Sequence, residues 1–149
     1  MVLWTTALNA ILPPGHTGNF YITSFGSDMI SVYDSSGTYL RNFTAAGLSG
    51  ARGIVFSPYH NIYVASQNTD EVFVFDRDEQ FLMRFTHITL SGPTGMAISA
   101  KEELYVSSFN NNEVVVFDLD GNMLRTFTAV GLNGPNCVAL DSHHNIYVS

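Results

Sequence analysis

Cysteine is nearly absent from this chain of 149 residues, and basic residues are scarce. The single cysteine, Cys137, excludes an intrachain disulfide and any zinc site built from several cysteines. Six Lys and Arg residues stand against 13 Asp and Glu, which gives a net charge of −7. Because a surface of that sign repels phosphate backbones and anionic lipids, we expect no nucleic acid and no membrane among the partners.

Long apolar runs are missing as well. No segment approaches the length of a membrane span, and Met1 to Leu12 lacks the basic start, the long apolar stretch and the cleavage pattern of a signal peptide. The composition, 46% hydrophobic and 13% charged, is that of a globular domain. The sequence therefore predicts a soluble protein and leaves its compartment unknown.

Helical periodicity is the third absence. No stretch repeats apolar residues at helical spacing, and the apolar runs are short and rich in β-branched and aromatic residues. Such runs, joined by turns that contain Gly, Asp, Asn and Ser, are typical of antiparallel strands. The sequence therefore predicts an all-β fold.

What the chain does contain is a repeat of 42 residues without gaps. One apolar tripeptide marks it, at Phe20–Ile22, Ile62–Val64, Leu104–Val106 and Ile146–Val148. We divide the chain into a partial unit (1–18), three repeats (19–60, 61–102 and 103–144) and a stub (145–149). A repeat of this length, built from short strands, is typical of arrays whose neighbouring units bury each other's faces.

Each repeat carries four strand signals, which is the number in one blade of a β-propeller. In the usual blade order, the strand from Gly53 to Ser57 is innermost, and the strands that start at Asn61, Glu71 and Phe81 follow outward. The second and third of these are apolar at successive positions, which indicates that both faces are covered. The fold class is thus a β-propeller of four-stranded antiparallel blades.

About three and a half repeats make an incomplete ring, because closed propellers have four or more blades. We expect the two end faces to need partners, either further propeller blades or another copy of the chain. The simpler explanation is that the 149 residues form part of a longer propeller. On its own, the chain is expected to be oligomeric or prone to aggregation.

The stretch from Gly92 to Phe127 carries a family resemblance, in Gly92–Ser99, Leu104–Ser107 and Glu113–Phe127. These segments resemble the NHL repeat and the wider group of six-bladed propellers that includes the SMP-30/gluconolactonase type. The resemblance implies a propeller that serves either as a binding platform or as a lactonase or lyase. The family's Asn-His-Leu triplet would fall at 27–29, 69–71 and 111–113, where acidic or neutral residues replace the basic ones.

The best candidate for function is the loop before each innermost strand, because its frame is constant while one position varies. In a propeller this loop lies beside the axial opening, together with the loops at 67–70 and 109–112. The candidate ligand-binding residues are Arg52, Thr94, Asn136, Asn68, Asp70, Asn110 and Asn112. The leading hypothesis is a non-enzymatic module that presents this rim to a protein, peptide, glycan or small ligand.

The alternative is a metal-dependent lactonase or lyase. It would draw Asn112, Asn136 and one of Glu71 or Glu113 onto a single axial ion that acts as a Lewis acid. No glutamate starts an innermost strand, and neither a phosphate-binding glycine loop nor a Gly-x-Ser-x-Gly elbow is present. We therefore assign no catalytic residue.

Two other clusters have structural explanations. Asp76 with Asp78, and Asp118 with Asp120, resemble the start of a calcium loop, but they recur at a hairpin turn and lack the downstream Glu. Turn geometry is the favoured interpretation, with Ca²⁺ or another divalent ion as the minor alternative. The histidines fall in turns of different blades, too far apart to share a zinc ion; they are His16, His60, His143 and His144. No metal site is assigned.

Overall fold

The computed structural model describes residues 18–149, and these residues form thirteen β-strands and no helix. The first sheet contains β1 (Phe20–Ser24), β2 (Met29–Tyr33) and β3 (Tyr39–Phe43), and the second contains β4 (Ala51–Phe56), β5 (Ile62–Ser66), β6 (Glu71–Phe75) and β7 (Phe81–Phe85). The third contains β8 (Pro93–Ile98), β9 (Glu103–Ser108), β10 (Glu113–Asp118) and β11 (Met123–Phe127), and the last contains β12 (Val138–Leu140) and β13 (Ile146–Val148). Among these residues, no helix exists that could cross a membrane.

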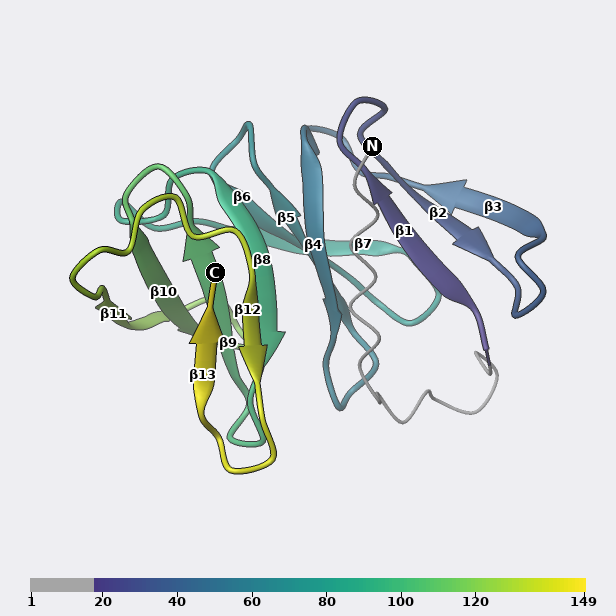
Figure 1. Ribbon diagram of the computed structural model, residues 1–149. Coiled ribbons are helices and arrows are strands. Elements are labelled where there is room, and N and C mark those ends of the chain that lie inside the picture. The colour runs from purple at the N-terminus through teal and green to yellow at the C-terminus, as the bar shows by residue number, and fades with distance from the viewer. Residues whose placement is uncertain (1–17) are drawn as a thin grey trace.

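The sheets are antiparallel meanders in which each strand pairs with the next one along the chain. Strand β4 of the second sheet contacts β8 of the third, and β8 contacts β12, so the first strand of each unit is the innermost one. Figure 1 shows the four sheets side by side, from β1–β3 at one end to β12–β13 at the other. These are β-propeller blades, as predicted. The partial unit predicted for residues 1–18, and His16 with it, lies outside the described residues except for Gly18.

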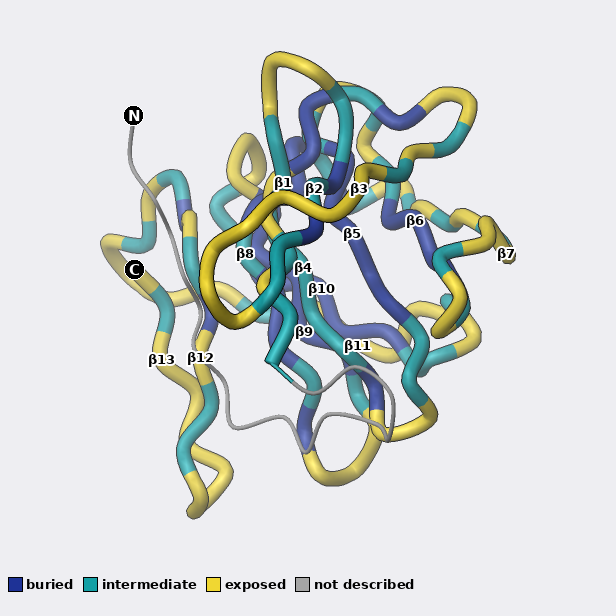
Figure 2. Tube along the Cα trace, turned by 90° about the vertical axis from the view of Figure 1, so that its right-hand side faces the viewer, coloured by how far each residue is buried: buried dark blue, intermediate teal, exposed yellow. Residues whose placement is uncertain are grey.

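The core lies between neighbouring blades rather than within one. Three apolar clusters fill the successive gaps between sheets, with Phe75 prominent in the first, Phe117 in the second and Tyr105 in the third. Strand β5 is buried at every position, and β6 at every position except Glu71, because a blade covers each of their faces. Figure 2 shows this burial along β5 and β6, with the exposed residues mainly in loops. The uninterrupted apolar pattern of these strands has this origin.

Aspartate residues hold the hairpins between the two outer strands of each blade. The Oδ1 atom of Asp76 accepts hydrogen bonds from the backbone N–H groups of Asp78 and Gln80, at 2.8 and 2.9 Å. Asp34 and Asp118 accept the same pair of bonds in their own blades. These contacts are those of the turn interpretation, in which the carboxylate replaces backbone partners inside the hairpin.

The outermost strands β3, β7 and β11 are exposed at most positions, because no further described element covers them. One detail differs from the sequence prediction. The innermost strand of the second blade begins at Ala51 rather than at Gly53, and that of the third begins likewise at Pro93. This difference affects the candidate site, because the added residues contain an irregularity in the pairing.

Candidate functional site

Each four-stranded blade has a β-bulge near the start of its innermost strand. The pairing of β4 with β5 skips Arg52 and Gly53, and the pairing of β8 with β9 skips Thr94 and Gly95. A bulge bends its strand and turns the side chain of the extra residue in a new direction. The variable positions that the sequence selected therefore lie on bulges.

The third equivalent position has the same geometry. The backbone N–H groups of Asn136 and Cys137 both donate to the carbonyl oxygen of Ser149, at 2.6 and 3.1 Å, so that two residues oppose one. The side chain of Asn136 is exposed, and that of Cys137 is half-buried. Arg52, Thr94 and Asn136 thus occupy equivalent places on three adjacent innermost segments.

These bulges belong to one rim of the arc. Because successive strands alternate in direction, the loops after the second and the fourth strand of each blade gather at the same end. We call this end the upper rim. It comprises the loops 25–28, 67–70 and 109–112, the loops 44–50, 86–92 and 128–135, and the bulges at 52–53, 94–95 and 136–137. It lies at the top of Figure 1, where the loop between β1 and β2 is visible. The opposite end is the lower rim, where the turn between β12 and β13 lies.

Two of the predicted binding residues clamp these loops to each other. Asp70 and Asn112 both have a positive φ, which Asp and Asn tolerate better than most residues. The side-chain Oδ1 of Asp70 accepts the N–H of Gly92 at 2.6 Å, and that of Asn112 accepts the N–H of Gly134 at 2.7 Å. Asp28 does the same in the first blade. These oxygens are used within the fold.

Thr94 also holds the rim together. Its side chain is only 2% exposed, and its hydroxyl donates to the carbonyl oxygen of Pro135 at 3.0 Å. Asn68 and Asn110 are exposed, and each side-chain amide lies within 3.3 Å of a serine hydroxyl, that of Ser49 or Ser91. The two exposed amides and Asn136 can present their polar groups to solvent, whereas Thr94 cannot.

Arg52 is an exposed charge on the upper rim and is held in place from two sides. Its Nε donates to Oε1 of Gln67 at 2.7 Å, and its guanidinium carbon lies 4.7 Å from the centre of the Phe25 ring. A cation over an aromatic face is attracted by the ring quadrupole. The backbone carbonyl of Arg52 accepts the hydroxyl of Thr23. Both its backbone and its side chain are therefore positioned.

Sequence reasoning selected the loops at 67–70 and 109–112 but missed three individual residues. Phe25, Gln67 and Phe109 occupy the same repeat position, directly after the second strand of their blades. Phe25 and Phe109 are 46% and 40% exposed, which is unusual for phenylalanine. The 42-residue repeat could have identified them, because it places two phenylalanines at a loop position where burial of a large apolar side chain is not expected.

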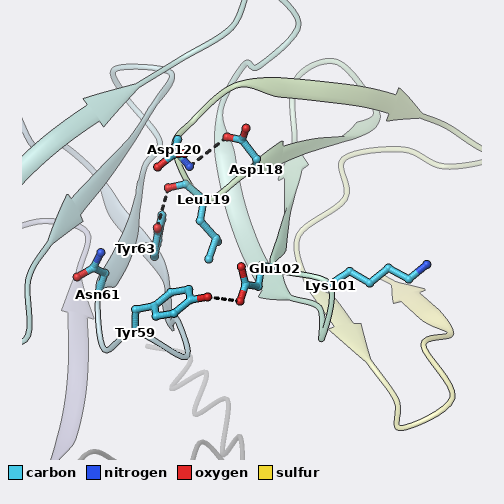
Figure 3. Close-up of a pocket in the computed structure, with 8 residues that line it drawn as sticks. All are labelled: Tyr59, Asn61, Tyr63, Lys101, Glu102, Asp118, Leu119 and Asp120. Carbon is cyan, nitrogen blue, oxygen red and sulfur yellow. Dashed lines mark hydrogen bonds between the residues drawn. The ribbon is translucent and has the colours of Figure 1, made fainter.

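The lower rim contains a separate hollow of about 410 Å³ between the second and third blades. Its lining comprises Tyr59, Asn61, Tyr63, Lys101, Glu102, Asp118, Leu119 and Asp120 (Figure 3). The hydroxyl of Tyr63 donates to the carbonyl oxygen of Leu119 at 2.8 Å, and that of Tyr59 donates to Oε1 of Glu102 at 2.5 Å. Burial and the negative charge of Asp120 raise the pKa of Tyr63 to about 12, so its hydroxyl stays protonated. No pattern in the sequence predicted this hollow.

The two glutamates proposed for an axial metal lie away from the innermost strands. Glu71 and Glu113 begin β6 and β10, which are two strands outward from the innermost strand, a distance of roughly 10 Å at the usual strand spacing. Glu71 pairs with Arg84 at 3.4 Å, and one carboxylate oxygen of Glu113 is buried without a hydrogen-bond partner. Between residues 18 and 149, no group of three or more His, Cys, Asp or Glu is close enough to hold an ion.

Comparisons with known proteins support the fold. The chain matches no protein-family model and no curated protein. Virginiamycin B lyase from Staphylococcus aureus superposes with a TM-score of 0.76 at 15% identity, over 89% of this chain and 45% of the lyase. Hydrazine synthase from Kuenenia stuttgartiensis gives 0.75 at 16% identity, over 97% and 45% of the two chains. The WD40 β-propeller domain of Doa1 gives 0.73 at 12% identity, over 88% and 43%.

These similarities have two consequences. At such low identity they show a β-propeller fold, and propellers of this kind include enzymes as well as a WD40 domain, so the fold does not select between the two functions. The chain also spans less than half the length of each of these three structures.

Proposed function

We propose that the chain is a non-enzymatic binding module that holds a protein, peptide, glycan or small ligand on its upper rim. The observation that supports this function is the kind of group that the rim leaves exposed. It offers a guanidinium, two phenyl rings and three side-chain amides, on Arg52, Phe25, Phe109, Asn68, Asn110 and Asn136. Such groups recognise ligands by hydrogen bonds and stacking, and none of them is a nucleophile beside a base.

The lower-rim hollow is the less favourable place for a ligand. Both of its tyrosine hydroxyls donate within the fold, and Asp118 accepts three hydrogen bonds from Asp120 and Asn122. Displacing the partners of Tyr63 and Asp118 would leave half-buried polar groups unsatisfied, which costs free energy. The upper rim requires no such displacement at Arg52 or Asn136.

The alternative function, a metal-dependent lactonase or lyase of the SMP-30/gluconolactonase type, has less support from the arrangement of residues. Its ligands would have to include Asn136 on an innermost segment and a glutamate two strands outward. All the donors of an axial ion must lie within bonding distance of that one ion. We therefore associate the chain with the NHL-like binding members of the propeller group rather than with the enzymes.

A matched pair of variants tests the proposed function. One variant carries Asn68→Ala, Phe109→Ala and Asn110→Ala on the upper rim, and the other carries Tyr59→Ala, Lys101→Ala and Asp120→Ala on the lower rim. We expect peptide or glycan arrays to show ligands that the wild type and the lower-rim variant bind and that the upper-rim variant loses. Loss only in the lower-rim variant, or metal-dependent hydrolysis of lactones with no array ligand, would contradict the proposal.

We also propose that the arc works as part of a ring, completed by further blades or by another copy of the chain. The support is the exposure of Phe20 and Ile22 on β1, at 52% and 37%. Their equivalents Ile62 and Val64 are buried against the preceding blade, at 1% and 0%. Light scattering tests this idea, because a monodisperse, cooperatively folding monomer would show that the end faces need no partner.

A further inference from the structure

Arg52 differs from the other arginines in the described part of the chain. Arg41 pairs with Glu79, Arg84 with Glu71 and Arg125 with Glu103, and Arg77 lies 3.7 Å from Asp78. Arg52 has no carboxylate within 4.0 Å in this range. In a chain with 13 acidic residues, an arginine without an acidic partner is unusual.

The guanidinium of Arg52 is also fixed in a way that leaves its outer edge available. Gln67 accepts the hydrogen bond of Nε, and Phe25 lies against the plane of the group. The two terminal nitrogens donate to none of the described residues. A planar guanidinium whose orientation is already set loses little freedom when it binds a planar, two-oxygen acceptor.

The charges around Arg52 restrict which anion fits. Asp28 and Asp70 stand on the adjoining upper-rim loops, where their Oδ1 atoms are bonded to backbone N–H groups. Together with the net charge of −7, these two carboxylates oppose a ligand of high charge. A single carboxylate suffers less from this repulsion than a phosphate dianion, and its two oxygens match the two terminal nitrogens that the guanidinium leaves free.

We propose that Arg52 is the anchor for a carboxylate group of the ligand, with Gln67 and Phe25 as its positioning residues. This inference rests on the proposed binding function of the upper rim and narrows its ligands to those that carry a carboxylate, such as a peptide terminus, an acidic side chain or an acidic sugar. The bidentate contact would form between the two Nη atoms and the two carboxylate oxygens.

The experiment follows the side-chain Nε–Hε NMR signals of the arginines during titration of the whole chain. Benzoate is the probe, benzamide is its uncharged isostere, and inorganic phosphate is the competing anion. We expect the Arg52 signal to shift and saturate with benzoate, at lower concentrations than the signal of Arg77 on the lower rim, and to stay unchanged with benzamide. Arg52→Gln should weaken benzoate binding by about tenfold, and Arg77→Gln should not.

Two further variants separate anchoring from exposed charge. Gln67→Leu leaves the charge of Arg52 in place but removes the partner of Nε, and we expect intermediate weakening. Arg52→Lys keeps the charge without the planar fork and should bind less tightly than the wild type. Signals of Arg52 and Arg77 that move together without saturation, or tighter binding of phosphate than of benzoate, would overturn the proposal.

The outcome is distinguishable from failure of the proposed function. If ligands from the arrays are lost in the upper-rim variant but retained in Arg52→Gln, the carboxylate assignment is wrong while the binding function stands. If benzoate saturates at Arg52 but the upper-rim variant loses no ligand, the anion site is supported and the wider function is wrong.

Discussion

Tyr63 and Tyr147 occupy the same repeat position in two blades, yet their surroundings are opposite. Tyr63 lies in the second blade and is 1% exposed, and its hydroxyl is bonded to the third blade. Tyr147 on β13 is 58% exposed. Tyr105, in the blade between them, is 5% exposed. The residue and its strand are the same in each case, so the difference comes from the neighbour. A propeller side chain is buried by the adjacent blade and not by its own sheet.

The same contrast appears at the other end of the arc. Phe20 on β1 takes the place of Ile62 and Leu104, and it is 52% exposed where they are 1% and 0%. The second blade (β4–β7) therefore has two covered faces, and each terminal sheet has one. It follows that equivalent substitutions should have unequal effects, largest in the interior of the arc and smallest at its ends.

The largest expected effect is the loss of the interior tyrosine. Tyr63→Ala removes a buried ring and its hydrogen bond to Leu119, and we expect a loss of about 3–5 kcal/mol in the free energy of unfolding. Tyr147→Ala at the equivalent end position should cost about 1 kcal/mol or less. Urea denaturation at a fixed protein concentration measures both values. Equal losses would mean that the end blade is covered in solution and would break the comparison.

The next largest effect concerns the spacing of the innermost strands. A Cβ atom on Gly95 would lie 2.6 Å from the carbonyl oxygen of Asn136 and from the Cα of Cys137, so the backbones themselves must move apart. We expect Gly95→Ala to cost about 1–3 kcal/mol. Gly26→Ala is the matched control, because a Cβ there meets nothing within 4 Å. Thermal unfolding compares them, and a neutral Gly95→Ala would argue against close contact of these strands.

Much of this architecture could be predicted from the sequence because the same local residue pattern recurs in each 42-residue repeat. The hairpin role of Asp76, the order of strands within a blade and the burial of β5 and β6 all follow from residues that recur in phase. Gly53 and Gly95 also recur in phase, at equivalent positions of the innermost strands. Their need for close approach is visible in the structure, where the neighbouring backbone occupies the place of a side chain.

The candidate site was less predictable because its geometry depends on contacts between repeats. The register identified Arg52 as a variable position, but not that Gln67 and Phe25 from two different blades would hold it. It also grouped Asp70 with the binding residues, although the carboxylate is bonded to a glycine N–H 22 residues away. No local pattern reports a hydrogen bond between two loops, and this is why loop residues of similar composition could not be divided into clamps and ligand-facing groups.

The loop clamps provide a third comparison between interior and end. Asp70→Ala removes a charged acceptor from the N–H of Gly92 and places alanine at a φ of 57°, and we expect a cost of about 2 kcal/mol. Asn112→Ala, at the clamp nearer the end of the arc, places alanine at a similar φ of 58° but removes a neutral acceptor, and it should cost less, about 1 kcal/mol. Asp70→Asn preserves the acceptor and is the control. Hydrogen exchange at the N–H of Gly92 reports the clamp directly, and unchanged protection in Asp70→Ala would contradict it.

The smallest expected effect is the pH dependence contributed by Glu103 in the third blade. Arg125 donates to both carboxylate oxygens of Glu103 at 2.8 Å, and the hydroxyl of Tyr105 donates to one of them at 2.8 Å. These hydrogen bonds, from Arg125 first, lower the pKa of Glu103 to about 2. The second blade has Asn61 at the position equivalent to Glu103 and lacks this network.

A carboxylate with a lowered pKa stabilises the fold while it is ionised, so its contribution is complete above the ordinary pKa of about 4.5 and disappears as the pH falls toward 2. Because the Arg125 side chain is 47% exposed, solvent screening limits the contribution to about 1 kcal/mol. Glu103→Gln should therefore differ from the wild type near neutral pH and converge with it in acid. Arg125→Met and the double variant complete a cycle that isolates the pair. Stability curves that stay parallel across this range would mean that the network does not distinguish the third blade from the second.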